Sequence, residues 1–137
     1  MNSTKRRSFL KRTLGALGLA PLLGFTLPQV PSVGGSFVHV VYFWMKNPED
    51  AEARETFLRN LVAFLNRVDV IRSYHVGTPA NTPRDIVDNS YTFALVVTFD
   101  GREGHDIYQD HPEHLSFIDQ TSNLWTKVQI YDSESVA

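Results

Sequence analysis

The chain has 137 residues, of which 42% are hydrophobic and 20% charged, and this composition fits one globular domain and excludes a wholly disordered protein. The absence of cysteine excludes disulfides, thiol catalysis and thiolate metal sites. Five basic residues lie among the first twelve, and the rest of the chain has eight basic against fifteen acidic residues, which argues against nucleic acid as a partner.

Residues 1–30 have the layout of an export signal. A basic head at residues 5–7 precedes an apolar run from Leu14 to Leu27, which is shorter than the roughly 20 residues that span a bilayer as a helix. Residues 6–11, RRSFLK, resemble the twin-arginine signal of bacterial exported proteins. This resemblance implies that the twin-arginine translocation machinery exports the folded protein, which would be periplasmic or secreted.

A linker at residues 31–36 is expected to join this signal to the main domain at residues 37–132, which a tail at residues 133–137 follows. Proline and glycine punctuate the linker. Cleavage of the signal is expected between Leu27 and Ser36, and the alternative is an uncleaved signal that anchors the protein in the membrane.

The domain is expected to begin with a strand at Phe37–Met45, because the segment is β-branched and aromatic. Both faces of this strand are apolar, so both should be covered. Asn47 as N-cap and Pro48 as the first helical residue predict the start of a helix. The apolar residues between Phe57 and Val68 recur at the spacing of one helical stripe.

The second half of the domain predicts two more strands around a long loop, then a broken helix and a last strand. Asp100 with Glu103 forms a capping-box pattern at the start of that helix, and Pro112 interrupts it. The long loop is of the kind that often borders a binding site. The expected segments, in chain order, are a strand at 70–76, the loop at 77–90, a strand at 91–99, helical turns at 100–109 and 114–122, and a strand at 125–131.

This β-α-β-β-α-β order predicts an α+β, ferredoxin-like fold. Two helical regions cover only one face of a four-stranded sheet, and the other face would expose a large apolar patch. We therefore expect a homodimer that buries this face against a second copy. The alternative is a monomer whose second face is covered by the linker.

The candidate chemical residues gather near the break in the second helix. Tyr108, His111 and His114 follow one another at intervals of three, which places neighbours on one side of a helix. His39 lies on an otherwise apolar strand face, and it would reach Tyr108 or His114 if that face meets the helices. His75 and His105 are expected to be ordinary surface or edge residues.

Three strings together resemble the stress-responsive dimeric α/β-barrel (Dabb) family: FVHVVYFWMK, SYTFALVVTFD and IYQDHPEHLSF. The resemblance implies a ferredoxin-like protomer whose sheet packs against that of a second copy to form a barrel. Some members are polyketide cyclases, and their acid–base pair corresponds to Tyr108 and His114 here. His39 matches a first-strand histidine near the pocket of these members, whereas Phe93 replaces a third-strand histidine and makes the pocket less polar.

The function expected from these features is the binding or conversion of a small carbonyl or aromatic compound, with no cofactor. Tyr108 and His114 are the expected catalytic residues. Two alternatives stay open: a non-catalytic dimeric stress-response or assembly module, and a metal- or haem-binding barrel with a metal held by His39, His111 and His114. The residues expected to bind substrate are His39, His111, Phe93, Phe57, Leu61 and Phe117.

Overall fold

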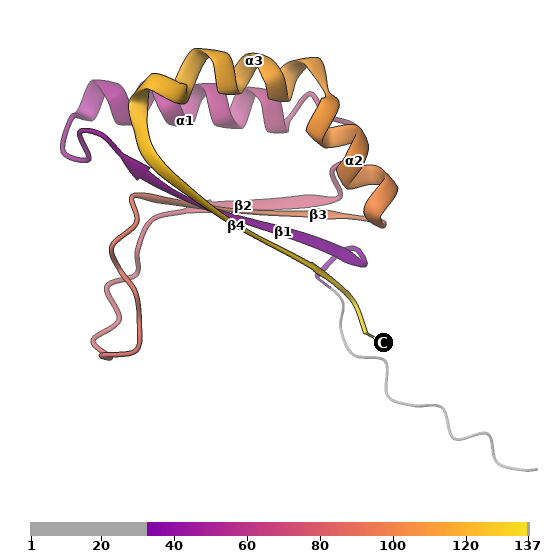
Figure 1. The fold of residues 1–137 in the computed structure, drawn as a ribbon, viewed down its shortest axis with the longest axis horizontal. Coiled ribbons are helices and arrows are strands. Elements are labelled where there is room, and N and C mark those ends of the chain that lie inside the picture. The colour runs from indigo at the N-terminus through magenta and orange to yellow at the C-terminus, as the bar shows by residue number, and fades with distance from the viewer. Residues whose placement is uncertain (1–32, 137) are drawn as a thin grey trace, which may run out of the picture.

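The centre of the molecule is a four-stranded antiparallel sheet with the strand order β2-β3-β1-β4. A computed structural model describes residues 33–136, so the predicted export signal lies outside the described residues. All three α-helices lie on one side of the sheet (Figure 1), which confirms the ferredoxin-like α+β fold. The elements are β1 (Phe37–Met45), α1 (Ala51–Leu65), β2 (Ser73–Gly77), β3 (Phe93–Phe99), α2 (Arg102–Asp110), α3 (Pro112–Thr121), the short 3-10 helix η1 (Ser122–Leu124) and β4 (Trp125–Glu134).

Strand β1 connects the two halves of the sheet, because it pairs with both β3 and β4. Its odd-numbered residues, from Phe37 to Met45, face the helices and are all buried. The register sets His39 opposite Val97 on one side and Asp132 on the other. Residues opposite each other in a sheet have neighbouring side chains, so β4 brings a carboxylate beside a buried histidine.

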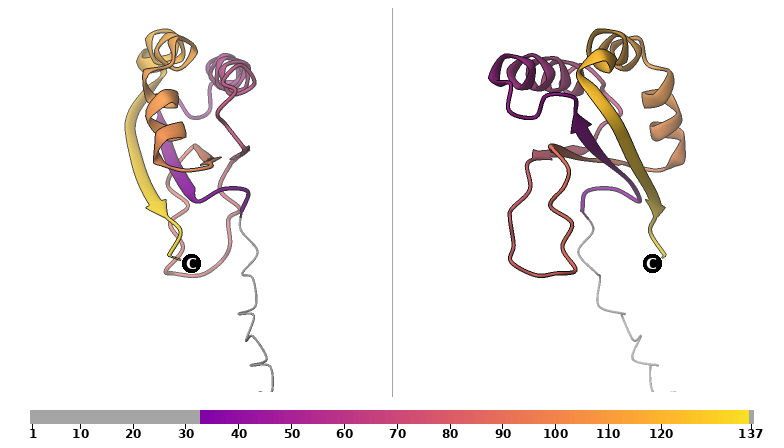
Figure 2. Two further views of the ribbon diagram at one scale, coloured as in Figure 1. Left: turned by 90° about the vertical axis from the view of Figure 1, so that its right-hand side faces the viewer. Right: turned by 60° about the vertical axis from the view of Figure 1, so that its left-hand side comes forward.

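Aromatic rings fill the space between the sheet and the helices. Phe57 of α1 stacks on Phe93 of β3, with ring centroids 5.2 Å apart, and meets Phe43 of β1 edge-on. Phe57 and the neighbouring Leu61 have no exposed surface. Helices α1 and α3 lie side by side above this layer (Figure 2), and their packing closes the core.

Two helix starts differ from the sequence prediction. Helix α1 begins at Ala51, and the carboxylate of Asp50 caps it by accepting the N–H groups of Glu52 and Ala53 at 3.0 and 3.1 Å. Asn47 belongs instead to the preceding turn, in which its carbonyl accepts the N–H of Asp50. Prediction of Asn47 as the cap was therefore wrong, because an aspartate nearer the apolar stripe satisfies two free N–H groups.

Helix α2 starts after Gly101, and no side chain of the described residues caps it. Asp100 does not act as the predicted cap, because its carboxylate pairs with Arg72. Two strands begin later than predicted, β2 at Ser73 and β3 at Phe93, and β4 continues past its predicted end to Glu134.

The sheet face away from the helices carries Val38, Val40, Tyr42 and Trp44 of β1, all partly exposed. Tyr131 of β4 lies opposite Val40 and keeps 60% of its surface exposed. We call these residues the outer sheet face. None of the helices formed by residues 33–136 covers this face (Figure 2). Within residues 33–136, no helix combines the length and the apolar character that crossing a membrane requires.

Candidate functional site

A cavity of about 260 Å³ lies between the sheet and the helices α2 and α3. Its wall is mostly apolar and includes residues of β1, β3, β4 and α3, among them Phe117 and Trp125. The polar side chains on this wall are His39, Tyr108, Gln109 and His114. A small apolar hollow with a few convergent polar groups is the usual form of a small-molecule site.

The break between α2 and α3 brings Tyr108 and His114 together. Tyr108 lies in the last turn of α2, and Pro112 begins α3 in a new direction. His114 therefore folds back onto Tyr108, with ring centroids 4.6 Å apart and ring planes at 30°. His111 stands at the break, where its Nδ1 accepts the N–H of Glu113 at 3.2 Å and caps α3.

The hydrogen bond of His114 defines which of its nitrogens is basic. Its Nδ1 lies 3.0 Å from the carbonyl oxygen of Gln109. Because a carbonyl only accepts, Nδ1 carries the hydrogen and Nε2 keeps a free lone pair. Burial lowers the pKa of His114 and outweighs the opposing effect of this hydrogen bond. The imidazole is therefore neutral and basic at Nε2 near pH 7.

Tyr108 is suited to donate a hydrogen bond. Only 1% of its surface is exposed. Burial raises its pKa, and the nearby charge of Asp132 adds to the effect. The hydroxyl therefore stays protonated over the whole physiological pH range.

His39 and Asp132 form the second polar pair of the site. Nδ1 of His39 lies 2.6 Å from Oδ1 of Asp132. A carboxylate next to an imidazole raises its pKa, but burial of the ring has the larger effect here, so the pKa of His39 is lowered. His39 is thus a neutral, hydrogen-bonded residue of the cavity wall, 5.5 Å from Tyr108 between ring centroids.

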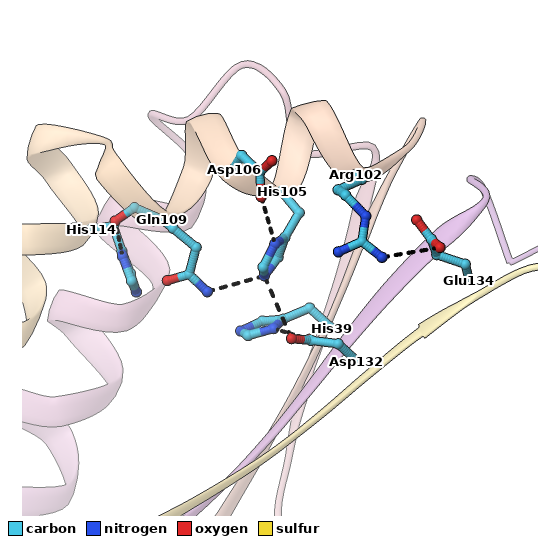
Figure 3. Close-up of polar contacts among 8 residues, drawn as sticks. All are labelled: His39, Arg102, His105, Asp106, Gln109, His114, Asp132 and Glu134. Atoms are coloured by element: carbon cyan, nitrogen blue, oxygen red, sulfur yellow. Dashed lines mark hydrogen bonds and ion pairs between the residues drawn. The ribbon is translucent and has the colours of Figure 1, made fainter.

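His105 belongs to the same cluster, although the sequence predicted it to be a surface or edge residue. Only 8% of its surface is exposed, and its ring stacks on Phe37 at 4.5 Å. Its Nε2 lies 3.9 Å from Oδ2 of Asp132. Figure 3 shows the imidazole of His105 pointing from α2 toward His39 and Asp132. The spacing of three between His105 and Tyr108 was the available signal that both share the inner face of α2.

The remaining predicted site residues separate into two groups. Phe117 lines the cavity. The other apolar residues, Phe57, Leu61 and Phe93, lie in the aromatic core and not on the cavity wall. His111 is also absent from that wall, since it caps α3. Exposed His75 lies on the edge strand β2, as predicted.

The described residues also bring together one set of metal-binding side chains. One ligand atom each from His39, His105 and Asp132 lie within 4.8 Å of one another. This set differs from the alternative of His39, His111 and His114 considered from the sequence.

A larger hollow of about 860 Å³ runs along the outer side of α1, but charged side chains such as Arg54, Glu55 and Arg59 line it and no histidine or tyrosine does.

Comparison with known proteins identifies two relatives that each match about 70% of the chain. The chain is 25% identical over 96 residues to the stress-response A/B barrel domain-containing protein At5g22580 of Arabidopsis thaliana, covering 70% of this chain and 83% of the relative. It is 24% identical over 94 residues to olivetolic acid cyclase of Cannabis sativa, covering 69% of this chain and 91% of that enzyme.

Two solved structures share the fold. A dimeric ferredoxin-like protein from Thermobifida fusca has a TM-score of 0.62 and 19% identity, covering 78% of this chain and 97% of that protein. The hydroxynitrile lyase of Passiflora edulis has a TM-score of 0.64 and 14% identity, covering 74% of this chain and 94% of that enzyme.

The sequence profile of one family matches residues 37–135, from the first strand to the end of the last. That family is described as the stress responsive A/B barrel domain, or Dabb. The resemblance noted in the sequence is thereby confirmed over most of the chain. This chain belongs to the Dabb family of stress-responsive A/B barrel domain proteins.

Proposed function

We propose that this protein binds a small carbonyl or aromatic compound in the 260 Å³ cavity and converts it by acid–base chemistry. His114 is the general base, and Tyr108 is the hydrogen-bond donor. The observation that carries the proposal is the stacking of these two rings at 4.6 Å on a largely apolar wall. Neither residue needs a cofactor for this role.

The chemistry follows from the protonation states of the two side chains. Nε2 of His114 takes a proton from the carbon next to a carbonyl group, and the imidazole becomes an imidazolium. The electron pair of the broken C–H bond moves to the carbonyl oxygen, which becomes an enolate. The hydroxyl of Tyr108 donates a hydrogen bond to that oxygen and stabilises its charge. After the enolate carbon attacks a second carbonyl, His114 returns the proton to the new alkoxide.

The size and the lining of the cavity suit a ligand that is small and mainly apolar. Its volume of about 260 Å³ lies just below the range of roughly 300–1,000 Å³ that is common for ligand sites. Trp125 lines the cavity, and its Nε1 is buried with no hydrogen-bond partner among the described residues.

Two of the similar proteins have names that describe enzymes of small organic compounds, olivetolic acid cyclase and hydroxynitrile lyase. Both names support a small-molecule reaction for this chain. The third-strand position at which the family's cyclases carry a histidine is Phe93 here, inside the aromatic core. We therefore propose a less polar substrate than a poly-β-ketone.

The test is a panel of aromatic and β-keto compounds, measured for binding by calorimetry and for conversion by chromatography. His114→Gln and Tyr108→Phe are compared with the wild type. Each is expected to lower turnover at least 100-fold, since a positioned acid or base contributes roughly 10²- to 10⁴-fold. The matched controls are His75→Gln and Tyr74→Phe, which change the same residue types on the edge strand β2. Equal turnover in the wild type and both site variants would refute the proposal.

A second candidate function is a non-catalytic dimeric module, which the partly exposed outer sheet face favours. Dimeric relatives of this fold support it as well. In that case His114 only packs against its neighbours. The wild type then converts no compound of the panel, and His114→Gln lowers the melting temperature. Turnover by the wild type that His114→Gln abolishes, with an unchanged melting temperature, excludes this candidate.

A further inference from the structure

We propose that His39, His105 and Asp132 form a binding site for one divalent first-row transition-metal ion. The three residues come from three elements, β1, α2 and β4, which meet at the end of the sheet next to the cavity. Two imidazole nitrogens and a carboxylate oxygen within 4.8 Å of one another are a ligand set for such ions. Figure 3 shows the carboxylate of Asp132 beside both rings.

The distances within the cluster are close to those of a metal site. Oδ1 of Asp132 lies 2.6 Å from Nδ1 of His39, and Oδ2 lies 3.9 Å from Nε2 of His105. Ligands that each lie about 2.1 Å from a metal are roughly 3.0–3.4 Å from one another. The first contact is a hydrogen bond, so the hydrogen on Nδ1 of His39 moves to Nε2 of the same ring when Nδ1 binds the ion. The second distance is longer than in a metal site, and rotation of the Asp132 side chain would shorten it. That side chain is 39% exposed and has room to rotate.

His105 presents a nitrogen lone pair at Nε2 to the cluster, where it accepts a hydrogen bond from Gln109. Its Nδ1 faces Oδ1 of Asp106 at 3.6 Å, and its Nε2 lies 3.0 Å from the side-chain nitrogen of Gln109, which donates to it. Both neighbours favour the tautomer with hydrogen on Nδ1 and a lone pair on Nε2. Histidines that bind metals usually donate the N–H of the other ring nitrogen to a carboxylate or carbonyl, and Asp106 lies just beyond hydrogen-bond distance of Nδ1. A bound ion takes the place of the Gln109 amide at Nε2.

The local charge also favours a cation. The nearby carboxylate of Glu134 already has a cationic partner, because it pairs with Arg102 at 3.1 Å. Asp106 and Asp132 have histidine neighbours, but within residues 33–136 neither has an arginine or lysine at ion-pair distance. A divalent ion would therefore add the positive charge that these two carboxylates lack.

The mixed nitrogen and oxygen ligands suit zinc, cobalt, iron or nickel better than magnesium or calcium, which prefer oxygen alone. Three protein ligands leave at least one position open on the ion. His39 lines the cavity, whereas His105 and Asp132 do not, so the ion would lie behind the cavity wall. This site is separate from the acid–base pair of Tyr108 and His114, and its occupancy does not depend on their reaction.

The test is titration of cobalt(II) into the full chain without a histidine tag, after removal of metals with a chelator. Visible absorption reports the coordination of cobalt, and calorimetry reports stoichiometry and affinity, so the readout is independent of any enzymatic activity. We expect one ion per chain. His105→Ala should raise Kd at least tenfold, and Asp106→Asn should raise it about tenfold through the lost support of His105.

Asp132→Asn provides a second variant in case His105→Ala fails to fold, because Asp132 is half-exposed. It should also raise Kd at least tenfold, and circular dichroism checks the fold of each variant. The matched controls His75→Ala and His111→Ala remove histidines outside the cluster and should leave Kd unchanged. The proposal is overturned if the wild type binds no cobalt, if folded Asp132→Asn binds it as tightly as the wild type, or if only His111→Ala loses binding.

Discussion

The ring of His114 stacks on the ring of Tyr108 at 4.6 Å, although six positions and a proline separate the two residues in the chain. The contact joins the end of one helix to the beginning of the next. It places a basic nitrogen and a hydroxyl donor on one cavity wall. Two predictions on pH depend on this arrangement.

The reaction rate should fall on the acidic side and stay high on the alkaline side. Burial lowers the pKa of His114 from its ordinary value of 6.5, so the base becomes protonated and inactive only below that pH. The raised pKa of Tyr108 keeps its hydroxyl protonated well into the alkaline range. Measurement of kcat/KM for a converted compound between pH 4.5 and 9.5 checks this, and an acidic limb with an apparent pKa above 6.5 would contradict it.

The free energy of unfolding should also fall with acidification. Because the folded pKa of His114 is lowered, the unfolded chain binds more protons than the folded one below about pH 6.5, and stability rises with pH in that window. The contribution of His114 to the free energy of unfolding is fully present above pH 6.5. It is lost as the pH falls through the pKa that His114 has in the folded protein. Urea titrations at several pH values measure this slope. It should be shallower in His114→Gln and unchanged in His75→Gln.

Phe57→Ala should destabilise the domain strongly. Phe57 is fully buried among Phe43, Phe93 and Phe117. Truncation of a buried phenylalanine costs about 3–5 kcal/mol of unfolding free energy. Denaturant unfolding measures the loss. The control Ile86→Ala removes a side chain that is 83% exposed and should change stability by no more than about 0.5 kcal/mol.

A charge on the outer sheet face should break the homodimer that we propose to form through this face. Val40 lies in the middle of that face between Val96 and Tyr131. Val40→Glu places a carboxylate where a second copy would pack, and burial of an unpaired charge is unfavourable. Light scattering after gel filtration should give twice the monomer mass for the wild type and the monomer mass for the variant. The control Ile107→Glu makes the same kind of change on helix α2, where Ile107 is 47% exposed, and should stay dimeric.

Export should depend on the paired arginines of residues 6–11. Replacement of both, Arg6→Lys with Arg7→Lys, keeps the charge but removes the pair that resembles a twin-arginine signal. Fractionation of bacteria that express the chain should show loss of the exported protein. Arg12→Lys, outside the string, should be exported normally, and export of the double variant at the wild-type level would contradict the prediction.

The fold could be predicted from sequence because local composition and periodicity indicate the type of each element. The β-branched and aromatic residues of Phe37–Met45 and the helical stripe after Ala51 identify their elements without knowledge of their neighbours. The proximity of Tyr108 and His114 could likewise be predicted, because both residues lie in one continuous string on either side of Pro112. Element boundaries were less certain, because Asp50 and Asn47 are both good caps and only the folded chain selects one.

The cluster around Asp132 was not predictable in the same way. Its contact with His39 depends on the register between β1 and β4, which are far apart in sequence, and its approach to His105 depends on the rotation of α2. The apolar pattern predicts that Phe57, Leu61 and Phe93 are buried. It does not indicate whether a buried ring faces a cavity or another ring, since both environments require the same apolar residue.

The helix break at Pro112 places the rings of Tyr108 and His114 on two different short helices above the same sheet. Small changes in the angle between these helices would alter the gap between base and donor without disturbing the strands. His111 and its neighbours at the helix break do not line the cavity. Substitutions there would therefore adapt the cavity to ligands of different length without changing its wall.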